Sequence, residues 1–152
     1  MLGSIVITAA LLIGPQTAPQ VHMTKADPIQ TGGQDSAYKG KYYRKTQERV
    51  RKCIGQREGR FQYWGTGSHG KYQSTHQMTA PLLRGAAWMM GDELRQMFGK
   101  KQGNRIQYRL LHTQGKYWHR FYMDMAFYVV ANWKHDGSGL RHWNGGRWVC
   151  KW

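Results

Sequence analysis

Acidic residues are scarce in this sequence. Only eight Asp and Glu stand against 23 Lys and Arg among 152 residues, so the formal net charge is +15 at pH 7. Such an excess of bases predicts an anionic partner, namely nucleic acid, a membrane surface or a cell wall. The same scarcity leaves few candidates for any mechanism that needs a carboxylic acid. Hydrophobic residues make up 40% of the chain, with seven Trp and nine Tyr, which excludes wholesale disorder.

Motifs for metals and nucleotides are missing as well. The seven His residues include no pair at the spacing of a zinc site, and there is no P-loop, GxGxxG or GxSxG motif. We therefore expect no metal and no nucleotide cofactor. The two cysteines, Cys53 and Cys150, lie too far apart for a zinc knuckle or a CxxC redox motif. They either form a disulfide in an oxidising space or remain buried thiols, and we favour the disulfide because each lies at an edge of the predicted domain.

No apolar run is long enough to cross a bilayer, which takes about 20 residues. Residues 1–18 form an apolar segment that resembles a weak signal peptide or anchor, since no Lys or Arg precedes Lys25. Residues 19–45 carry prolines, glycines and polar residues typical of a linker or a loosely held arm. The folded domain is therefore expected over residues 46–152, with no stable membrane span and with no indication of the oligomeric state.

Hydrophobic periodicity predicts a mainly α fold. Thr46 is expected to cap a first helix that ends before Gly59. The strongest pattern runs from Trp118 to Trp133, where apolar residues recur every three or four positions as on a long buried helix. Shorter helices are predicted over residues 81–90, 92–98 and 104–112. The glycine-rich stretch 64–73 is too short for another helix, and a Gly- and Trp-rich tail follows residue 134.

Among the eight acids, Glu58 has the most distinctive surroundings. It flanks the apolar stripe of the first helix and immediately precedes an aromatic, glycine-containing loop. Burial beside apolar groups favours the protonated form of a carboxylate, which a general acid requires. The alternative is a surface glutamate paired with Arg57 or Arg60. Asp124 is expected on the solvated side of the long helix, because it projects away from the centre of the apolar stripe.

Two further segments resemble a known family when they are read together with Glu58. Residues 53–58 (CIGQRE) followed by 70–73 (GKYQ) look like the core of the lysozyme-like superfamily, and the pattern at 142–150 (HWNGGRWVC) also looks familiar. The nearest branch comprises the resuscitation-promoting factors of actinobacteria and the transglycosylase-like domains of their bacteriophages. The resemblance covers residues 46–150. It implies a small goose- or transglycosylase-type helical domain with a Gly-rich loop or small hairpin after the catalytic helix.

The resemblance also implies an activity, namely cleavage of the β-1,4 MurNAc–GlcNAc bond of peptidoglycan. Glu58 would act as acid and then as base, as a single catalytic glutamate without a cofactor. No acid lies between Glu58 and Asp92, which favours a lytic transglycosylase over a two-carboxylate hydrolase. Gly59 and Ser74 depart from the family pattern and affect the details of substrate binding. The residues that would bind the glycan are Tyr72, Gln73, Trp64, His142 and Trp143.

Other functions fit the composition too. A basic chain with interleaved Tyr and Trp is typical of nucleic-acid-binding proteins, although no known nucleic-acid motif accompanies the charge. A virion structural protein with a non-catalytic lysozyme-like domain is a further alternative. Under the enzyme hypothesis the protein acts outside the cell or at the cell wall, as a secreted enzyme, a phage endolysin or a virion-borne lysin.

Overall fold

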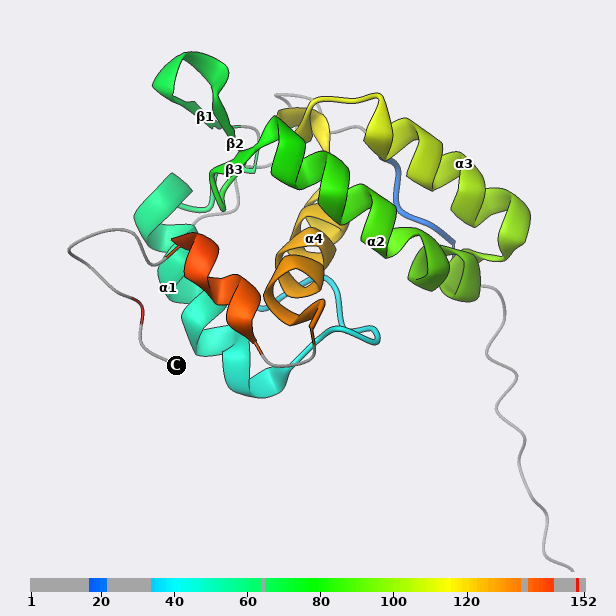
Figure 1. Cartoon of the computed structure of the whole chain (residues 1–152), viewed down its shortest axis with the longest axis horizontal. Helices are drawn as coiled ribbons and strands as arrows, with labels where there is room; N and C mark the ends of the chain where they lie inside the picture. Colours follow the sequence, from blue (N-terminus) through cyan, green and yellow to red (C-terminus); the bar gives the residue numbers. More distant parts are fainter. Residues whose placement is uncertain (1–16, 22–33, 64, 135–136, 144–149, 151–152) are drawn as a thin grey trace, which may run out of the picture.

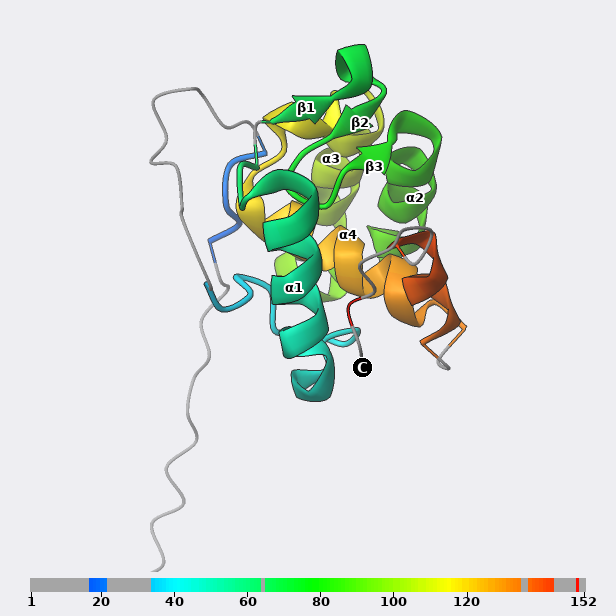
Figure 2. The same ribbon diagram turned by 90° about the vertical axis from the view of Figure 1, so that its left-hand side faces the viewer.

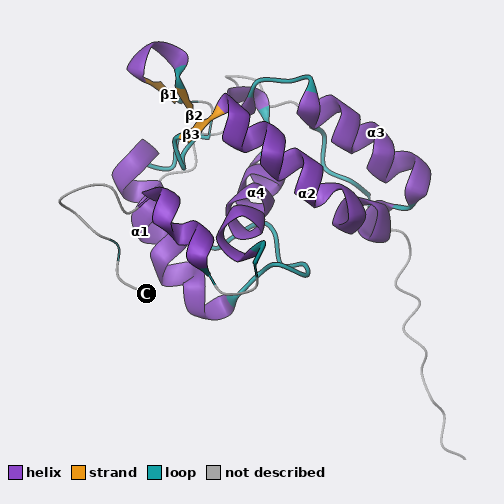
Figure 3. Ribbon diagram, viewed as in Figure 1, coloured by secondary structure: helices purple, strands orange, loops and turns teal. Residues whose placement is uncertain are grey.

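The computed structural model describes residues 17–21, 34–63, 65–134, 137–143 and 150 (Figure 1). The described part is mainly helical, as predicted, with one small sheet (Figure 3). Short 3-10 helices occupy Lys45–Gln47, Ser68–Gly70, Gly115–Tyr117 and Ser138–Trp143. The other elements are α1 (Glu48–Gly59), β1 (Thr66–Gly67), β2 (Tyr72–Gln73), β3 (Met78–Thr79), α2 (Ala80–Phe98), α3 (Lys100–Leu111) and α4 (Arg120–Asn132). No helix in these ranges is long and apolar enough to cross a membrane.

Helix α4 forms the centre of the domain, with α1 on one side and α2 and α3 on the other (Figure 1). Every residue from Tyr122 to Asn132 is buried, so this helix has no solvent-facing side. It begins two residues later than predicted, because the side chain of His119 accepts a hydrogen bond from the amide of Phe121 and caps it. Trp118 therefore precedes the helix, yet it is 1% exposed and belongs to the core.

Helix α2 is continuous where the sequence predicts two short helices. Gly91, at the expected break, lies within the helix, and its missing side chain leaves room for the side chain of Gln107 of α3. A Cβ at Gly91 would lie 2.3 Å from the Nε2 atom of Gln107. The chain turns only at Gly99, whose φ of 80° is readily adopted by glycine, and α3 then returns along α2. Its observed span, Lys100–Leu111, begins earlier than the predicted helix at residues 104–112.

The glycine-rich stretch and the residues after it form a three-stranded antiparallel sheet in the order β1-β2-β3 (Figure 2). Thr66 pairs with Gln73, and Gln73 in turn pairs with Met78. Each strand has two residues, so the sheet is a small appendage between α1 and α2. This arrangement agrees with the small hairpin expected after the first helix.

Residues 34–44, predicted to be part of a loose arm, pack instead against the helices. Tyr38 is fully buried, and its hydroxyl donates to Oε1 of Glu93 at 2.9 Å. The same carboxylate oxygen accepts the amide of Lys41 at 2.7 Å. Val21, from the separate stretch 17–21, is also buried. The folded domain thus includes chain that lies before the predicted boundary at residue 46.

The predicted disulfide between Cys53 and Cys150 is confirmed. The two Cα atoms lie 5.8 Å apart, and the bond links the middle of α1 to the end of the chain across 97 positions. Disulfides of this kind persist in oxidising environments. By the loop-entropy model, closing a loop of about 100 residues contributes up to about 4.7 kcal/mol.

The close packing of α2 on α3 predicts opposite effects for two glycine substitutions. A Cβ at Gly103 would lie 2.6 Å from backbone atoms of Arg95, whereas a Cβ at Gly85 would have no neighbour within 4 Å. Gly103→Ala should therefore lower the free energy of unfolding by about 1–3 kcal/mol. Gly85→Ala should raise it by about 0.5–1 kcal/mol because alanine favours the helix. Urea denaturation measures both, and equal effects would contradict this packing.

Candidate functional site

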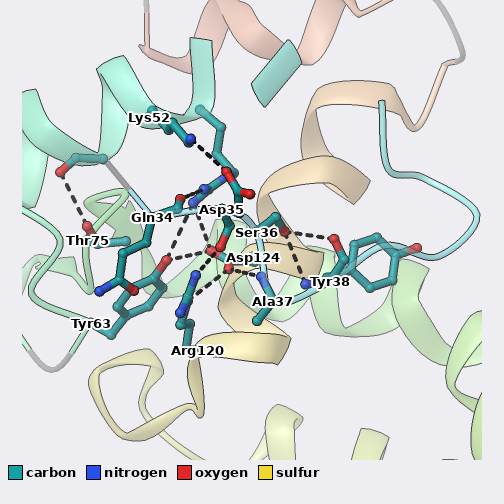
Figure 4. Close-up of polar contacts among 12 residues, drawn as sticks. Gln34, Asp35, Ser36, Ala37, Tyr38, Lys52, Tyr63, Thr75, Arg120 and Asp124 are labelled. Atoms are coloured by element: carbon teal, nitrogen blue, oxygen red, sulfur yellow. Dashed lines mark hydrogen bonds and ion pairs between the residues drawn. The ribbon is translucent and has the colours of Figure 1, made fainter. Parts of the chain in front are cut away.

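A buried ion pair connects α1 to α4. Nη1 of Arg51 lies 3.2 Å from Oδ1 of Asp124, and both side chains are fully buried. Asp124 also accepts the hydroxyl of Tyr63 at 2.7 Å and the amide of Ala37 at 2.9 Å (Figure 4). Arg51 donates in addition to Glu48, with Nε 2.6 Å from Oε2, and to the carbonyl of Gln34. These hydrogen bonds satisfy two charges that would otherwise be costly to bury.

The prediction that Asp124 is solvated was wrong. Its angular position on α4 does lie away from the apolar stripe, but residues 34–38 cover that side of the helix. The backbone of this segment supplies the Ala37 amide to Asp124, and Arg120 adds a second cation 3.5 Å from Oδ2. Burial raises the pKa of Asp124, whereas Arg51 and Tyr63 oppose that shift.

Glu48 belongs to the same network, but its pKa is lowered. Burial by itself would raise the pKa of Glu48, but hydrogen bonds from Arg51, the Ser36 amide and the Tyr128 hydroxyl lower it to about 2. The folded protein therefore stabilises the charged form of this carboxylate. Its side chain is 13% exposed, so little water competes with these donors.

Glu58 lies in the last turn of α1, about two turns beyond Arg51. Its side chain is 29% exposed and is paired with Arg57, whose Nε lies 2.7 Å from Oε1. Glu58 therefore has the Arg57 partner that the alternative interpretation, a paired surface glutamate, predicted. Oε2 of Glu58 has no hydrogen-bond partner among the described residues and can meet a ligand. A carboxylate at the carboxyl end of a helix opposes the helix dipole, so its position does not serve the stability of α1.

The chain after Glu58 has unusual backbone geometry. Six non-glycine residues of the described chain have positive φ, between 46° and 64°, and all of them fall between residues 60 and 77. They are Arg60, Phe61, Ser68, His69, Ser74 and Gln77. Arg60 ends α1 in the left-handed conformation while its amide bonds to the carbonyls of Gln56 and Gly55. Residues held in this region cluster at functional sites, because the strain persists only where the surroundings enforce it.

Gly59 brings the end of α1 against the turn between β2 and β3. A Cβ at this position would lie 2.6 Å from Cα of Thr75, so a larger residue would force the two segments apart. The hydroxyl of Thr75 also donates to the carbonyl of Gly55 at 3.3 Å. Gly59 is one of the two departures from the family pattern, and the structure gives it a packing role beside Glu58.

Gln73 and Tyr72 lie on β2 but differ in their surroundings. Gln73 is 7% exposed, and its Oε1 accepts the amide of Gly115 at 2.6 Å. It lines a cavity of about 180 Å³, bounded also by Leu83 and Arg84 of α2 and by residues 110–115 and Trp118. Tyr72 is half-buried, with Nζ of Lys71 5.4 Å from the centre of its ring. Neither Tyr72 nor Glu58 lines this cavity.

The remaining predicted binding residues are more scattered. Trp143 is 6% exposed, and its indole nitrogen donates to the carbonyl of His76 at 2.7 Å. Its own carbonyl accepts a hydrogen bond from Arg57, so it touches the partner of Glu58 through its backbone. His142 is exposed beside it. Trp64 lies outside the described residues.

The other carboxylates are occupied or exposed elsewhere. Glu48, Glu93 and Asp124 are held in buried hydrogen-bond networks, as described above. Asp35 and Asp92 are 78% and 79% exposed and pair with Lys52 and Arg95. Asp27 and Asp136 lie outside the described residues. Oε2 of Glu93 has no partner among the described residues either, but Glu93 is buried at 4% exposure. Glu58 is thus the one described acid that is partly exposed and has an oxygen without a partner among the described residues.

His76 is a polar core residue that the sequence did not single out. Its ring is fully buried, 4.9 Å from the ring of Phe127, and neither ring nitrogen has a hydrogen-bond partner in the part of the chain that the structure describes. Burial, and then the charge of Arg51, lower its pKa well below the usual value. The imidazole is therefore neutral and acts as part of the aromatic core.

No three His, Cys, Asp or Glu side chains within the described ranges are grouped so that they could hold a metal ion. Comparison of the chain with protein-family models, with curated proteins and with solved structures gave no match.

The charged state of Glu48 predicts a pH dependence of stability. Its pKa is about 2 in the folded protein and 4.5 in the reference state, so its ionisation contributes about 3 kcal/mol above pH 5. This contribution is lost as the pH falls towards 2, because the unfolded chain binds the proton first. The difference in unfolding free energy between the parent protein and Glu48→Gln should narrow by that amount from pH 6 to pH 2. Asp124 is present in both proteins, so its titration largely cancels. Guanidinium denaturation over this range measures the difference, and a constant gap would contradict the assignment.

Proposed function

We propose that this protein cleaves the β-1,4 MurNAc–GlcNAc bond of peptidoglycan with Glu58 as its single catalytic carboxylate. The observation that carries the proposal is the different placement of the described acids, among which Glu58 alone is partly exposed and also has an oxygen without a partner among the described residues. The resemblance of residues 53–58 and 70–73 to the lysozyme-like superfamily supports the same assignment. The left-handed residues that follow Glu58 support it independently, since such strain is typical of active sites.

The reaction needs two proton transfers at one carboxylate. In the first, protonated Glu58 gives its proton to the glycosidic oxygen as the bond to the anomeric carbon breaks. The substrate's own N-acetyl group supplies the function that a second carboxylate serves in most glycosidases. In the second, the Glu58 carboxylate takes the proton of the C6 hydroxyl, whose oxygen then bonds to the anomeric carbon. The product is a 1,6-anhydro sugar, as in lytic transglycosylases.

Arg57 pairs with one carboxylate oxygen of Glu58 and leaves the other open. Two nitrogens of Arg57 lie 2.7 and 2.5 Å from Oε1, which leaves Oε2 as the oxygen that faces the substrate. Gln73 offers another polar group, in the cavity that Glu58 does not line. Its Oε1 accepts the amide of Gly115, and its Nε2 has no partner among the described residues. That amide can donate to a hydroxyl or N-acetyl oxygen of the glycan.

The disulfide and the net charge suit a protein that works at a cell wall. A disulfide persists in an oxidising space, and a chain of charge +15 adheres to an anionic wall. We therefore place the activity outside the cytoplasm, in a secreted or phage-encoded lysin.

Glu58→Gln should abolish the clearing of a peptidoglycan suspension, with a loss of at least a thousandfold in initial rate. The variant should fold as well as the parent, because Glu58 is partly exposed and opposes the dipole of α1. Asp92→Asn, the same kind of change at an exposed acid of α2, serves as the matched control and should retain full activity. The proposal would be contradicted if Glu58→Gln cleared the suspension at the parental rate. It would also be contradicted if the parent protein released no fragments from peptidoglycan.

A further inference from the structure

The outer face of the α2–α3 pair exposes large aromatic rings. Trp88 on α2 is 69% exposed and Tyr108 on α3 is 64% exposed, although side chains of this size are normally buried. The two helices are in contact next to these residues, because the side chain of Gln107, the residue before Tyr108, donates to the carbonyl of Trp88 at 3.1 Å. Exposed aromatic residues grouped in this way mark interaction surfaces.

The exposed side of α3 is also uniformly basic. Its residues Lys101, Arg105, Tyr108 and His112 recur at intervals of four, three and four, which places them on one exposed face opposite the buried Gly103, Ile106 and Leu110. No Asp or Glu occurs between Glu93 and Asp124. Arg105 has no ion-pair or hydrogen-bond partner among the described residues. Lys101 lies in the first turn of α3, where a cation opposes the helix dipole, so its charge is not explained by helix stability.

Tyr108 is held in place by its neighbour on the same face. Its ring stacks on that of His112, with 4.1 Å between the centres, and Nδ1 of His112 lies 2.7 Å from the carbonyl of Tyr108. A ring fixed in this way loses little conformational freedom when a ligand packs on it. The stripe from Lys101 to His112 is about 16 Å long, since a helix rises about 1.5 Å per residue. Its length suits a polymer better than a single small group.

The surface adjoins a cavity that contains Gln73, one of the residues proposed to bind the glycan. Arg84 lies one turn before Trp88, and both Arg84 and His112 line the cavity of about 180 Å³ that also contains Gln73. The cavity therefore connects Gln73 with Arg84 and His112, and the exposed rings of Trp88 and Tyr108 lie next to these two residues along their helices. Trp133, an exposed aromatic residue that follows α4, does not line this cavity.

From these observations we infer that the α2–α3 surface, formed by Arg84, Trp88, Lys101, Arg105, Tyr108 and His112, is a second binding region for the peptidoglycan strand that Glu58 cuts. The inference rests on the proposed function. Trp88 and Tyr108 pack on sugar rings, and Lys101 and Arg105 pair with the carboxylates of the stem peptides. Single-stranded nucleic acid offers similar chemistry, stacking with negative charge. The adjoining cavity that contains Gln73 favours the substrate polymer.

Equilibrium binding to insoluble peptidoglycan tests the inference without turnover. All proteins carry Glu58→Gln, so the polymer stays intact, and the peptidoglycan is stripped of attached phosphate polymers by acid. The test variants are Trp88→Ala with Tyr108→Ala, and separately Arg105→Glu. The matched controls are Trp133→Ala and Arg49→Glu, which change exposed residues outside the surface. Thermal unfolding of each variant verifies that it folds. If the double variant does not fold, Arg105→Glu alone tests the inference.

Both test variants should bind stripped peptidoglycan at least tenfold more weakly than the protein that carries Glu58→Gln alone. The affinities of both controls should stay within twofold of that protein. Unchanged binding, or an equal loss in the controls, would overturn the inference. A loss confined to walls that retain phosphate polymers would overturn it as well, as would weaker binding of oligothymidylate with unchanged binding of peptidoglycan. These outcomes are separable from a failure of the proposed function, which is decided by whether Glu58→Gln still clears peptidoglycan.

Discussion

The guanidinium of Arg51 and the carboxylate of Asp124 lie together in the core, where neither could remain charged without the other. Around them the fold supplies the Tyr63 hydroxyl, the Ala37 amide, the Gln34 carbonyl and Glu48. The network thereby joins α1, α4 and the segment before α1, which come from distant parts of the sequence. Removing one partner of such a pair costs about 3–5 kcal/mol, because an uncompensated charge stays buried. The arrangement of the two helices and of the segment that covers them depends on this interaction.

The same network explains why the acids divide as they do. Asp124 and Glu48 are consumed by Arg51 and its neighbours, and Glu93 fixes the segment around Tyr38. Arg51 anchors α1 about two turns before Glu58, so the backbone that carries Glu58 is held rigidly. The disulfide ties the middle of this helix to the end of the chain. The chain thus holds three of its six described acids, Glu48, Glu93 and Asp124, in buried networks and leaves Glu58 partly exposed.

Hydrophobic spacing was enough to predict the helical class and the approximate positions of the helices, because local periodicity records which face is buried. It failed where distant segments decide. Asp124 was expected in solvent because residues 34–38, which cover it, cannot be placed from the pattern of α4 alone. The side chain that occupies the space beside Gly91, and that donates to the carbonyls of Ala87 and Trp88, is Gln107 of the next helix. Glu58 could be singled out from its neighbours in sequence, whereas the exposed rings of Trp88 and Tyr108 lie on helices whose partners the sequence does not reveal.

The chemical outcome of cleavage tests the transglycosylase account most directly. Peptidoglycan digested by the parent protein in water enriched in oxygen-18 should yield fragments that end in 1,6-anhydro sugars, which mass spectrometry detects as free of the label. These ends form because the substrate's own C6 hydroxyl replaces water as the nucleophile. Reducing ends that carry one labelled oxygen would show that water attacks the anomeric carbon. That result would contradict the transglycosylase account, because the bond would then have been hydrolysed.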